Sequence, residues 1–151
     1  MSLEITSGLS TPESLHALIK SRRYGTTNEA ELCGEIEDLF RQNGIDHVRE
    51  ATLAAAYRPS GIVAHVSAVA RRRAQLTRTE RHGDRIDFLV GRIGIEVKTR
   101  HSRADVLRQL DRYAQSEMLD SLILVTTRAQ HRDAPESIRG KPLALVYLCP
   151  L

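Results

Sequence analysis

The stretch 85–99 limits the fold of this chain more than any other part of the sequence. Apolar residues alternate with other residues in 85–90 and again in 93–98, and this period of two is typical of β-strands. Gly91 and Arg92 separate the two runs, and glycine tolerates the positive φ that a two-residue hairpin turn requires. The sequence therefore predicts a β-hairpin in this stretch.

Side chains on a strand point alternately to its two faces, so each strand of the hairpin should have one apolar face. The residues expected on that face are Ile86, Phe88 and Val90 on the first strand and Ile93, Ile95 and Val97 on the second. The opposite face of the second strand should carry Gly94, Glu96 and Lys98. Because the hairpin folds back on itself, Asp87 should lie beside Glu96 and Lys98.

Two carboxylates beside a lysine are a candidate metal site. Asp87 and Glu96, with the main-chain carbonyl of Val97, offer the hard oxygen ligands that Mg²⁺ prefers and that Mn²⁺ also accepts. Lys98 next to such a metal can position or activate an attacking water, while the metal stabilises a phosphate and its leaving oxygen. The structural alternative is a solvated strand face with cross-strand ion pairs.

Lysine is rare in this chain, which favours a functional role for Lys98. Of the 22 basic residues, only Lys20, Lys98 and Lys141 are lysines. Arginine is almost always charged and is a poor proton acceptor, whereas the pKa of a lysine can be lowered near a metal. A lysine at this position in an arginine-rich chain is therefore a candidate catalytic residue.

The pattern formed by Asp87, eight further residues, the Glu-Val-Lys triplet 96–98 and an amphipathic helix resembles the PD-(D/E)xK nuclease superfamily. Its members include type II restriction enzymes, archaeal-type Holliday junction resolvases and RecB-like nucleases, and the small resolvase-like and RecB-like nucleases resemble this chain most. The resemblance spans 28–127, and Ile86 stands where a proline often precedes the aspartate. It implies an α/β fold with a restriction-endonuclease-like αβββαβ core, in which helices flank a mixed central sheet. It also implies Mg²⁺-dependent hydrolysis of phosphodiester bonds, in DNA more often than in RNA.

A helix should precede these strands. Polar residues at 26–28 predict its N-cap, and Gly44 predicts its end. Its apolar stripe consists of Leu32, Cys33, Ile36, Leu39 and Phe40. Glu29 falls on this stripe and Glu35 lies at its edge. The first core helix of the superfamily often supplies a glutamate to the metal site, so Glu29 is the first candidate and Glu35 the second. The alternative for Glu29 is a favourable interaction with the helix dipole alone.

Two further elements are predicted on either side of that helix. Thr11 followed by proline predicts an additional N-terminal helix that ends within 21–25. The stretch 46–53 has the pattern of the first core strand. Glu50 on this strand is another candidate site residue, and its alternative is an ion pair with a surface arginine.

Positive charge is concentrated around the predicted site, although the net charge is only +3. Residues 1–57 carry five basic and nine acidic groups, whereas 58–103 carry eleven basic and four acidic groups. The stretch 62–75 predicts a basic helical insertion between the first two core strands, which suits binding to a polyanion. The alternative is a solvated, charged helix end. The residues predicted to contact nucleic acid are Arg71, Arg72, Arg73, Arg78, Arg81, Arg85, Arg100 and Arg103.

The hairpin is followed by a predicted helix that begins after Ser102 and continues to about residue 116. Gln109 and Tyr113 on this helix resemble the Gln…Tyr signature of RecB-like nucleases, in which the glutamine lies near the metal site. The alternative for Gln109 is an exposed position without a role. The apolar run 122–125 predicts a strand buried on both faces.

A length of 151 residues predicts one domain, with an N-terminal arm and helix (1–25), a core (28–127) and a C-terminal loop and strand (128–151). No apolar run approaches the roughly 20 residues that span a bilayer, so no membrane partner is expected. The N-terminal residues lack a signal-peptide layout, and two cysteines without metal-ligand spacing favour a reducing, cytoplasmic setting. A homodimer is an open alternative. Two other function classes also stay open: a catalytically inactive nucleic-acid-binding module, and a structural subunit whose charged residues form ion pairs.

Overall fold

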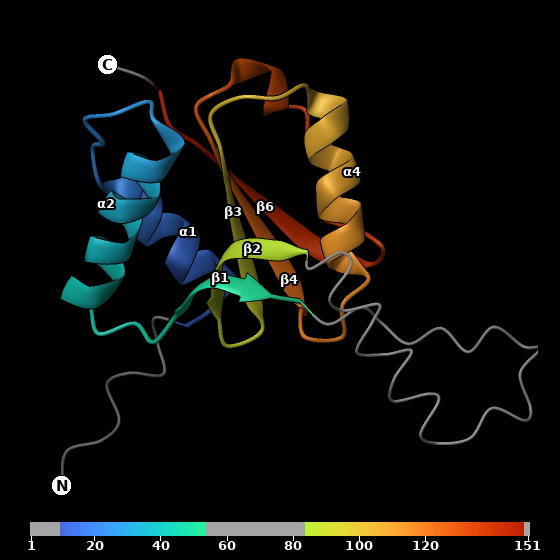
Figure 1. Cartoon of the computed structure of the whole chain (residues 1–151), viewed down its shortest axis with the longest axis horizontal. Helices are drawn as coiled ribbons and strands as arrows, with labels where there is room; N and C mark the ends of the chain where they lie inside the picture. Colours follow the sequence, from blue (N-terminus) through green and yellow to red (C-terminus); the bar gives the residue numbers. More distant parts are fainter. Residues whose placement is uncertain (1–9, 54–83, 150–151) are drawn as a thin grey trace, which may run out of the picture.

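The computed structural model describes residues 10–53 and 84–149. This part of the chain has an α/β fold with a mixed six-stranded sheet and three α-helices (Figure 1). The helices are α1 (Pro12–Ser21), α2 (Glu29–Gln42) and α4 (Arg103–Ala114). The strands are β1 (Val48–Thr52), β2 (Arg85–Val90), β3 (Ile93–Lys98), β4 (Ser121–Thr126), β5 (Ser137–Ile138) and β6 (Lys141–Tyr147). The predicted basic insertion at 62–75 lies outside the described residues.

The sheet has the strand order β1-β2-β3-β4-β6-β5. The first three strands form an antiparallel meander, whereas β3, β4 and β6 are parallel to one another. α4 is the crossover between β3 and β4. Because β3 and β4 are parallel, they end at the same edge of the sheet. Lys98 pairs with Thr126, and Thr126 pairs with Tyr147. We call this edge, at the ends of β3, β4 and β6, the carboxyl edge.

Two hydrophobic clusters cover the two faces of the sheet. α1 and α2 lie on one face, and α4 lies on the other (Figure 1). The first cluster joins the helical residues Leu15, Ile19, Leu32, Cys33, Ile36 and Phe40 to strand residues that include Phe88, Ile95, Val97, Ile123 and Val125. The second joins Val106, Leu110, Tyr113 and Ala114 of α4 to residues that include Ile86, Leu119, Leu122 and Leu124. β3 and β4 are buried along their whole length, as the apolar run in β4 predicted.

Each helix begins where its N-cap predicted. Thr11 caps α1 through a capping box with Ser14, and Asn28 caps α2 by accepting hydrogen bonds from the main-chain N–H groups of Ala30 and Glu31. Ser102 caps α4 in the same way through Asp105. These side chains satisfy main-chain donors that have no partner inside the helix. None of the helices in the described residues is long and apolar enough to cross a membrane.

The prediction that Ile86 shares a face with Phe88 was wrong. Phe88 packs with α1 and α2, whereas Ile86 packs with α4, although only one residue separates them. The alternation of β2 is interrupted at Asp87, whose carboxylate oxygen Oδ2 accepts a hydrogen bond from the main-chain N–H of Val97 at 2.7 Å. The neighbouring strand β1 adapts at Glu50, which has a positive φ of 46°. An irregularity of this kind re-aims a side chain, and here it turns Asp87 toward β3.

The stretch 128–141 is more structured than its polar sequence predicted. It contains a 3-10 helix (Ala129–His131) and β5, which pairs antiparallel with β6. His131 anchors this stretch because its buried ring bonds to the hydroxyl of Thr126 at 2.7 Å and to the carbonyl of His101 at 3.2 Å. A tertiary contact therefore orders residues whose local sequence predicts only a loop.

Gly94 allows the sheet to pack closely against the segment after α4. A Cβ atom at this position would lie 2.6 Å from Cδ1 of Ile86 and 3.1 Å from Leu119, and both of these side chains are buried. Gly94→Ala should therefore lower the free energy of unfolding by about 1–3 kcal/mol, because the core has to shift. Urea denaturation measures this change.

Gly34→Ala is the matched control for this prediction. Gly34 lies inside α2 with open space around its Cα, so alanine there should raise stability by about 0.5–1 kcal/mol through helix propensity. Equal effects of the two substitutions would contradict the close packing at Gly94.

Candidate active site

Asp87, Glu96 and Lys98 come together next to the carboxyl edge. Asp87 accepts the Val97 N–H, and the Asp87 N–H in turn lies 3.4 Å from Oε2 of Glu96. The ammonium Nζ of Lys98 lies 2.6 Å from Oε1 of Glu96. Glu96 and Lys98 are buried, with 2% and 7% of their surface exposed, and Asp87 is half-buried. The hairpin thus brings together the three ionisable groups that the sequence singled out.

Glu29 reaches the same cluster from α2. Because Asn28 is the N-cap, Glu29 is the first residue of the helix, and its carboxylate extends beyond the helix start toward β3. Its Oε1 atom lies 3.6 Å from Nζ of Lys98, and its Oε2 atom accepts a hydrogen bond from the Thr99 N–H at 3.2 Å. The side chain stays 35% exposed, so the cluster opens to solvent on this side.

Burial disfavours the charged form of both hairpin carboxylates, so the pKa of each is raised. Burial raises the pKa of Glu96 to about 7, and the negative charge of Asp87 contributes to this rise against the opposing effect of Lys98. Burial also raises the pKa of Asp87, and the hydrogen bond from Val97 only partly offsets it. In both cases the pKa is raised because nearby positive charge and hydrogen bonds only partly offset the cost of burying a charged carboxylate.

Lys98 carries its charge in this environment. Burial lowers the pKa of Lys98, but the negative charges of Glu96, Glu29 and Asp87 outweigh burial and hold the pKa above its usual value. A charged ammonium donates hydrogen bonds and cannot accept a proton. In the metal-free chain Lys98 is therefore a hydrogen-bond donor to its carboxylate neighbours.

The donor set of this cluster fits Mg²⁺. The cluster contains one ammonium and three carboxylates, since Glu96 and Glu29 lie next to Lys98 and Asp87 is bonded to the Val97 N–H, and a divalent cation would balance the excess of negative charge. No group of three His, Cys, Asp or Glu side chains in the described residues is arranged to hold a metal by itself. Mg²⁺ usually binds through one or two protein carboxylates and takes its other oxygens from water and substrate phosphate, so Asp87 and Glu96 suffice.

Two buried polar atoms adjoin the cluster without a hydrogen-bond partner. Within residues 10–53 and 84–149, only Nη1 of Arg49 and Oγ1 of Thr99 are in this position. Thr99 follows Lys98 directly and binds Glu29 through its main chain. Buried groups of this kind are costly to leave unsatisfied, so both atoms are available to bond to water, an ion or a ligand.

Arg49 is a site residue that the sequence did not single out. Its guanidinium lies 4.6 Å from the centroid of the Phe88 ring and 3.6 Å from the carboxylate of Glu37. Its charge also opposes the rise in the pKa of Asp87. The sequence carries little indication of this position, because Arg49 meets Phe88 only through the register between β1 and β2.

The remaining predicted glutamates lie elsewhere. The carboxylate of Glu35 faces Arg22 at 3.9 Å, and that of Glu50 pairs with Arg85 at 3.3 Å on the surface. Neither contacts Lys98. Glu35 lies on α2 nearly two turns beyond Glu29, and Glu50 points outward because its positive φ turns the strand. The surface ion pair was the alternative considered for Glu50.

Gln109 approaches the cluster through Tyr113. Its side-chain amide donates a hydrogen bond to the Tyr113 hydroxyl at 2.6 Å, and that hydroxyl donates to the Arg85 carbonyl at 2.7 Å. Burial raises the pKa of Tyr113, and the nearby charge of Glu96 raises it further. The pair therefore attaches α4 to the start of β2, next to Asp87.

The arginines predicted to bind nucleic acid divide into two groups. Arg71, Arg72, Arg73, Arg78 and Arg81 lie outside the described residues. Of the others, Arg85 pairs with Glu50, and Arg103 donates to the carbonyl of Asp133 at 2.6 Å. Arg100 is exposed and has no ion-pair partner among the described residues. Arg100 and Arg103 both follow β3 closely, so their charges lie beside the carboxyl edge.

The cluster described above is the part of the chain from which a function can be inferred. Comparisons of the chain with protein-family models, with curated proteins and with solved structures found no match.

Proposed function

We propose that this chain is a metal-dependent nuclease of the PD-(D/E)xK type that hydrolyses phosphodiester bonds, with DNA as the favoured substrate. The observation that carries the proposal is the meeting of the buried Glu96 carboxylate and the half-buried Asp87 carboxylate, from adjacent strands, with Lys98, whose Nζ lies 2.6 Å from Glu96. The order α2-β1-β2-β3-α4-β4 supports it, because it agrees with the αβββαβ core that the sequence motif implies.

Asp87 and Glu96 would hold the metal, with the Val97 carbonyl as a further ligand. Mg²⁺, or Mn²⁺ in its place, would supply charge stabilisation to the phosphate and its leaving oxygen and would acidify a bound water. The hydrogen bond from the Val97 N–H fixes one oxygen of Asp87 and leaves the other free to act as a ligand. Burial on β3 holds Glu96 in a single orientation.

Lys98 and Glu29 would handle the attacking water. The charged Lys98 ammonium donates a hydrogen bond, so it can hold the water or a phosphate oxygen in line for attack. Glu29 lies on the solvent side of Lys98 and has an exposed carboxylate, so it can orient the water and accept its proton. Arg100 and Arg103 would neutralise neighbouring phosphates.

A cleavage assay on a panel of nucleic acids tests this proposal. Labelled linear duplex, circular single-stranded and four-way-junction DNA, together with RNA, would be incubated with Mg²⁺, Mn²⁺ or EDTA. Metal-dependent cleavage is the expected result, and the substrate that is cleaved fastest identifies the subtype. Tight, salt-sensitive binding without cleavage of any substrate would overturn the nuclease proposal and favour an inactive nucleic-acid-binding module.

Glu29 and Glu35 allow a matched test on one helix. Glu29→Gln should lower the rate of metal-dependent cleavage by about 10- to 100-fold, because a neutral amide neither balances Lys98 nor accepts a proton. Glu35→Gln removes the same charge but only loses a long contact with Arg22, so its rate should stay within about twofold of the wild type. Equal rates for the two variants would remove Glu29 from the proposed site.

A further inference from the structure

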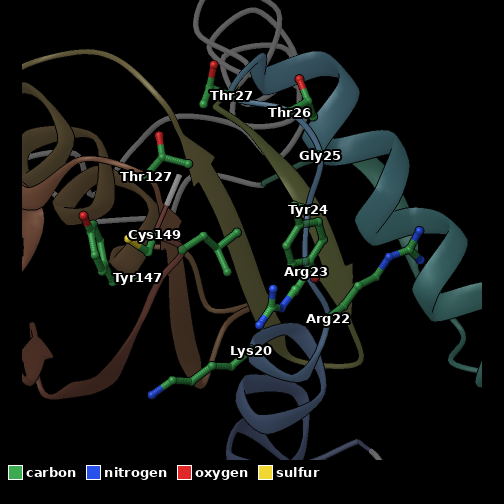
Figure 2. Close-up of a pocket in the computed structure, with 11 residues that line it drawn as sticks. Lys20, Arg22, Arg23, Tyr24, Gly25, Thr26, Thr27, Thr127, Tyr147 and Cys149 are labelled. Carbon is green, nitrogen blue, oxygen red and sulfur yellow. The ribbon is translucent and has the colours of Figure 1, made fainter. Parts of the chain in front are cut away.

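A basic cavity of about 410 Å³ lies between the end of α1 and the end of β6 (Figure 2). The residues that line it include Lys20, Arg23, Tyr24, Thr27, Thr127 and Tyr147, and no carboxylate of residues 10–53 or 84–149 is among them. Its volume falls within the range of roughly 300–1,000 Å³ that is usual for small-ligand sites. Figure 2 shows Arg22 pointing away toward α2, where it faces Glu35, whereas Lys20 extends toward the side formed by Tyr147.

Two of the three cations that line this cavity, Lys20 and Arg23, have no carboxylate partner among the described residues, whereas Arg22 faces Glu35. No ion pair or side-chain hydrogen bond joins Lys20 or Arg23 to another residue in the described part of the chain. Away from the carboxyl edge, most arginines do pair with carboxylates. Those pairs involve Arg41, Arg85, Arg92, Arg108, Arg112 and Arg139. Free positive charge thus collects at the carboxyl edge, which favours an anionic ligand there.

The cavity shares its rim with the proposed active site. Thr27 is two residues before Glu29, so their backbones lie within about 7 Å of each other. On the other side, the Thr127 N–H donates a hydrogen bond to the Lys98 carbonyl at 3.4 Å. A chain of phosphates that passes Lys98 can therefore reach the cavity within one or two nucleotides.

The walls of the cavity suit a nucleotide better than a bare anion. The rings of Tyr24 and Tyr147 line it, and bases stack on aromatic rings with little dependence on sequence. The Tyr24 ring is held by a hydrogen bond from its hydroxyl to the Ile19 carbonyl at 2.8 Å, and Tyr147 is held by Arg132, 4.0 Å from its ring centroid. Cations beside fixed aromatic rings are the usual arrangement for binding a single strand.

We infer that this cavity binds a nucleotide unit of one substrate strand through its phosphate, next to the position of hydrolysis. This inference rests on the proposed nuclease function for the identity of the strand. Lys20 and Arg23 neutralise the phosphate, Thr27 and Thr127 line the part of the cavity that faces the proposed active site, and the tyrosines bound the space for the base. The same chemistry serves a phosphate inside the strand or a phosphate at its 5′ end.

The test is binding of fluorescein-labelled DNA in EDTA, where no metal-dependent cleavage takes place. The Lys20→Gln/Arg23→Gln double variant should weaken binding of single-stranded DNA about 10-fold and reduce the slope of log K against log[salt] by about 0.7, since the contact with one phosphate is lost. Arg41→Gln/Arg139→Gln removes two paired surface charges instead, and it should leave the slope unchanged. Thermal melting of all variants checks that they fold.

Two further measurements show which phosphate the cavity binds and separate this inference from the nuclease proposal. If the wild type prefers 5′-phosphate DNA over 5′-hydroxyl DNA and the Lys20→Gln/Arg23→Gln variant does not, the cavity binds the phosphate at a strand end. If the variant loses the same affinity for both kinds of DNA, the cavity binds an internal phosphate. In Mg²⁺, the same variant should raise KM with kcat unchanged if the chain is a nuclease. Cavity-dependent binding without cleavage would sink the nuclease proposal alone, whereas an unchanged salt slope and KM would overturn the inference about the cavity alone.

Discussion

Glu96→Gln should raise the stability of the metal-free chain by about 1 kcal/mol at pH 5 and by about 3 kcal/mol at pH 8. The pKa of Glu96 is raised from 4.5 to about 7, mainly by burial and secondarily by Asp87. Each unit of this shift corresponds to about 1.4 kcal/mol. A glutamine has nearly the same shape as a protonated glutamate but never acquires the charge.

The direction of this pH dependence follows from the number of protons that the folded and unfolded states bind. Between about pH 4.5 and pH 7 the folded chain keeps the Glu96 proton while the unfolded chain releases it, so the folded state loses stability as the pH rises. Asp87, whose pKa is also raised, acts in the same direction. The lowered pKa of His131, caused mainly by burial, acts in the opposite direction, but it cancels when the two proteins are compared.

Urea denaturation in EDTA from pH 5 to pH 8 measures the difference. The account also predicts that Mg²⁺ stabilises the wild type at pH 8 and leaves Glu96→Gln nearly unaffected, since only the wild type keeps both carboxylate ligands. If the cluster were instead a structural ion pair between Glu96 and Lys98, the variant would be less stable than the wild type at pH 8. That outcome would contradict a metal site.

Lys98→Met should lower metal-dependent cleavage by about 10²- to 10⁴-fold, which is the usual contribution of one group that handles a proton or a water. Methionine fills a volume similar to that of the buried aliphatic stem of Lys98, so the substitution leaves no void. What is lost is the ammonium that lies between Glu96 and Glu29. Single-turnover cleavage at saturating Mg²⁺ measures the loss in the chemical step.

Lys141→Met is the control for this substitution. Among the described residues, the Lys141 ammonium bonds to the Ser116 carbonyl, at the opposite end of β6 from the carboxyl edge, so its removal should not change the rate of cleavage. Lys98→Arg should not restore activity, because the planar guanidinium does not fit the small space between two carboxylates. Wild-type rates in both Lys98 variants would exclude Lys98 from the chemistry.

Much of the secondary structure could be predicted from the sequence because its signals are local. Asn28 and Ser102 cap the helices that they were expected to begin, and Gly44 and Gly91 adopt the positive φ that ends α2 and turns the hairpin. The convergence of Asp87 with the end of β3 also followed from local information, because a hairpin of known turn position has a defined register.

The rest depended on contacts between distant segments. The change of face at Asp87 arises from the bond that Val97 donates across the hairpin, and no alternation pattern reports such a bond. The helical stripe could rank Glu29 before Glu35, but only the packing of α2 on the sheet brings Glu29 to Lys98. Arg23 was predicted only as part of a helix end, and Lys20 was given no role, because their relation to β6 exists only in the folded chain.

The most direct test of the central claim is the rate of DNA cleavage as Mg²⁺ is added, measured for the wild type and for Asp87→Asn. The account predicts a wild-type rate that rises with Mg²⁺, saturates and disappears in EDTA, and a rate for Asp87→Asn that is lower by about 10²-fold or more at every concentration. Cleavage that continues in EDTA, or an Asp87→Asn variant as active as the wild type, would contradict it.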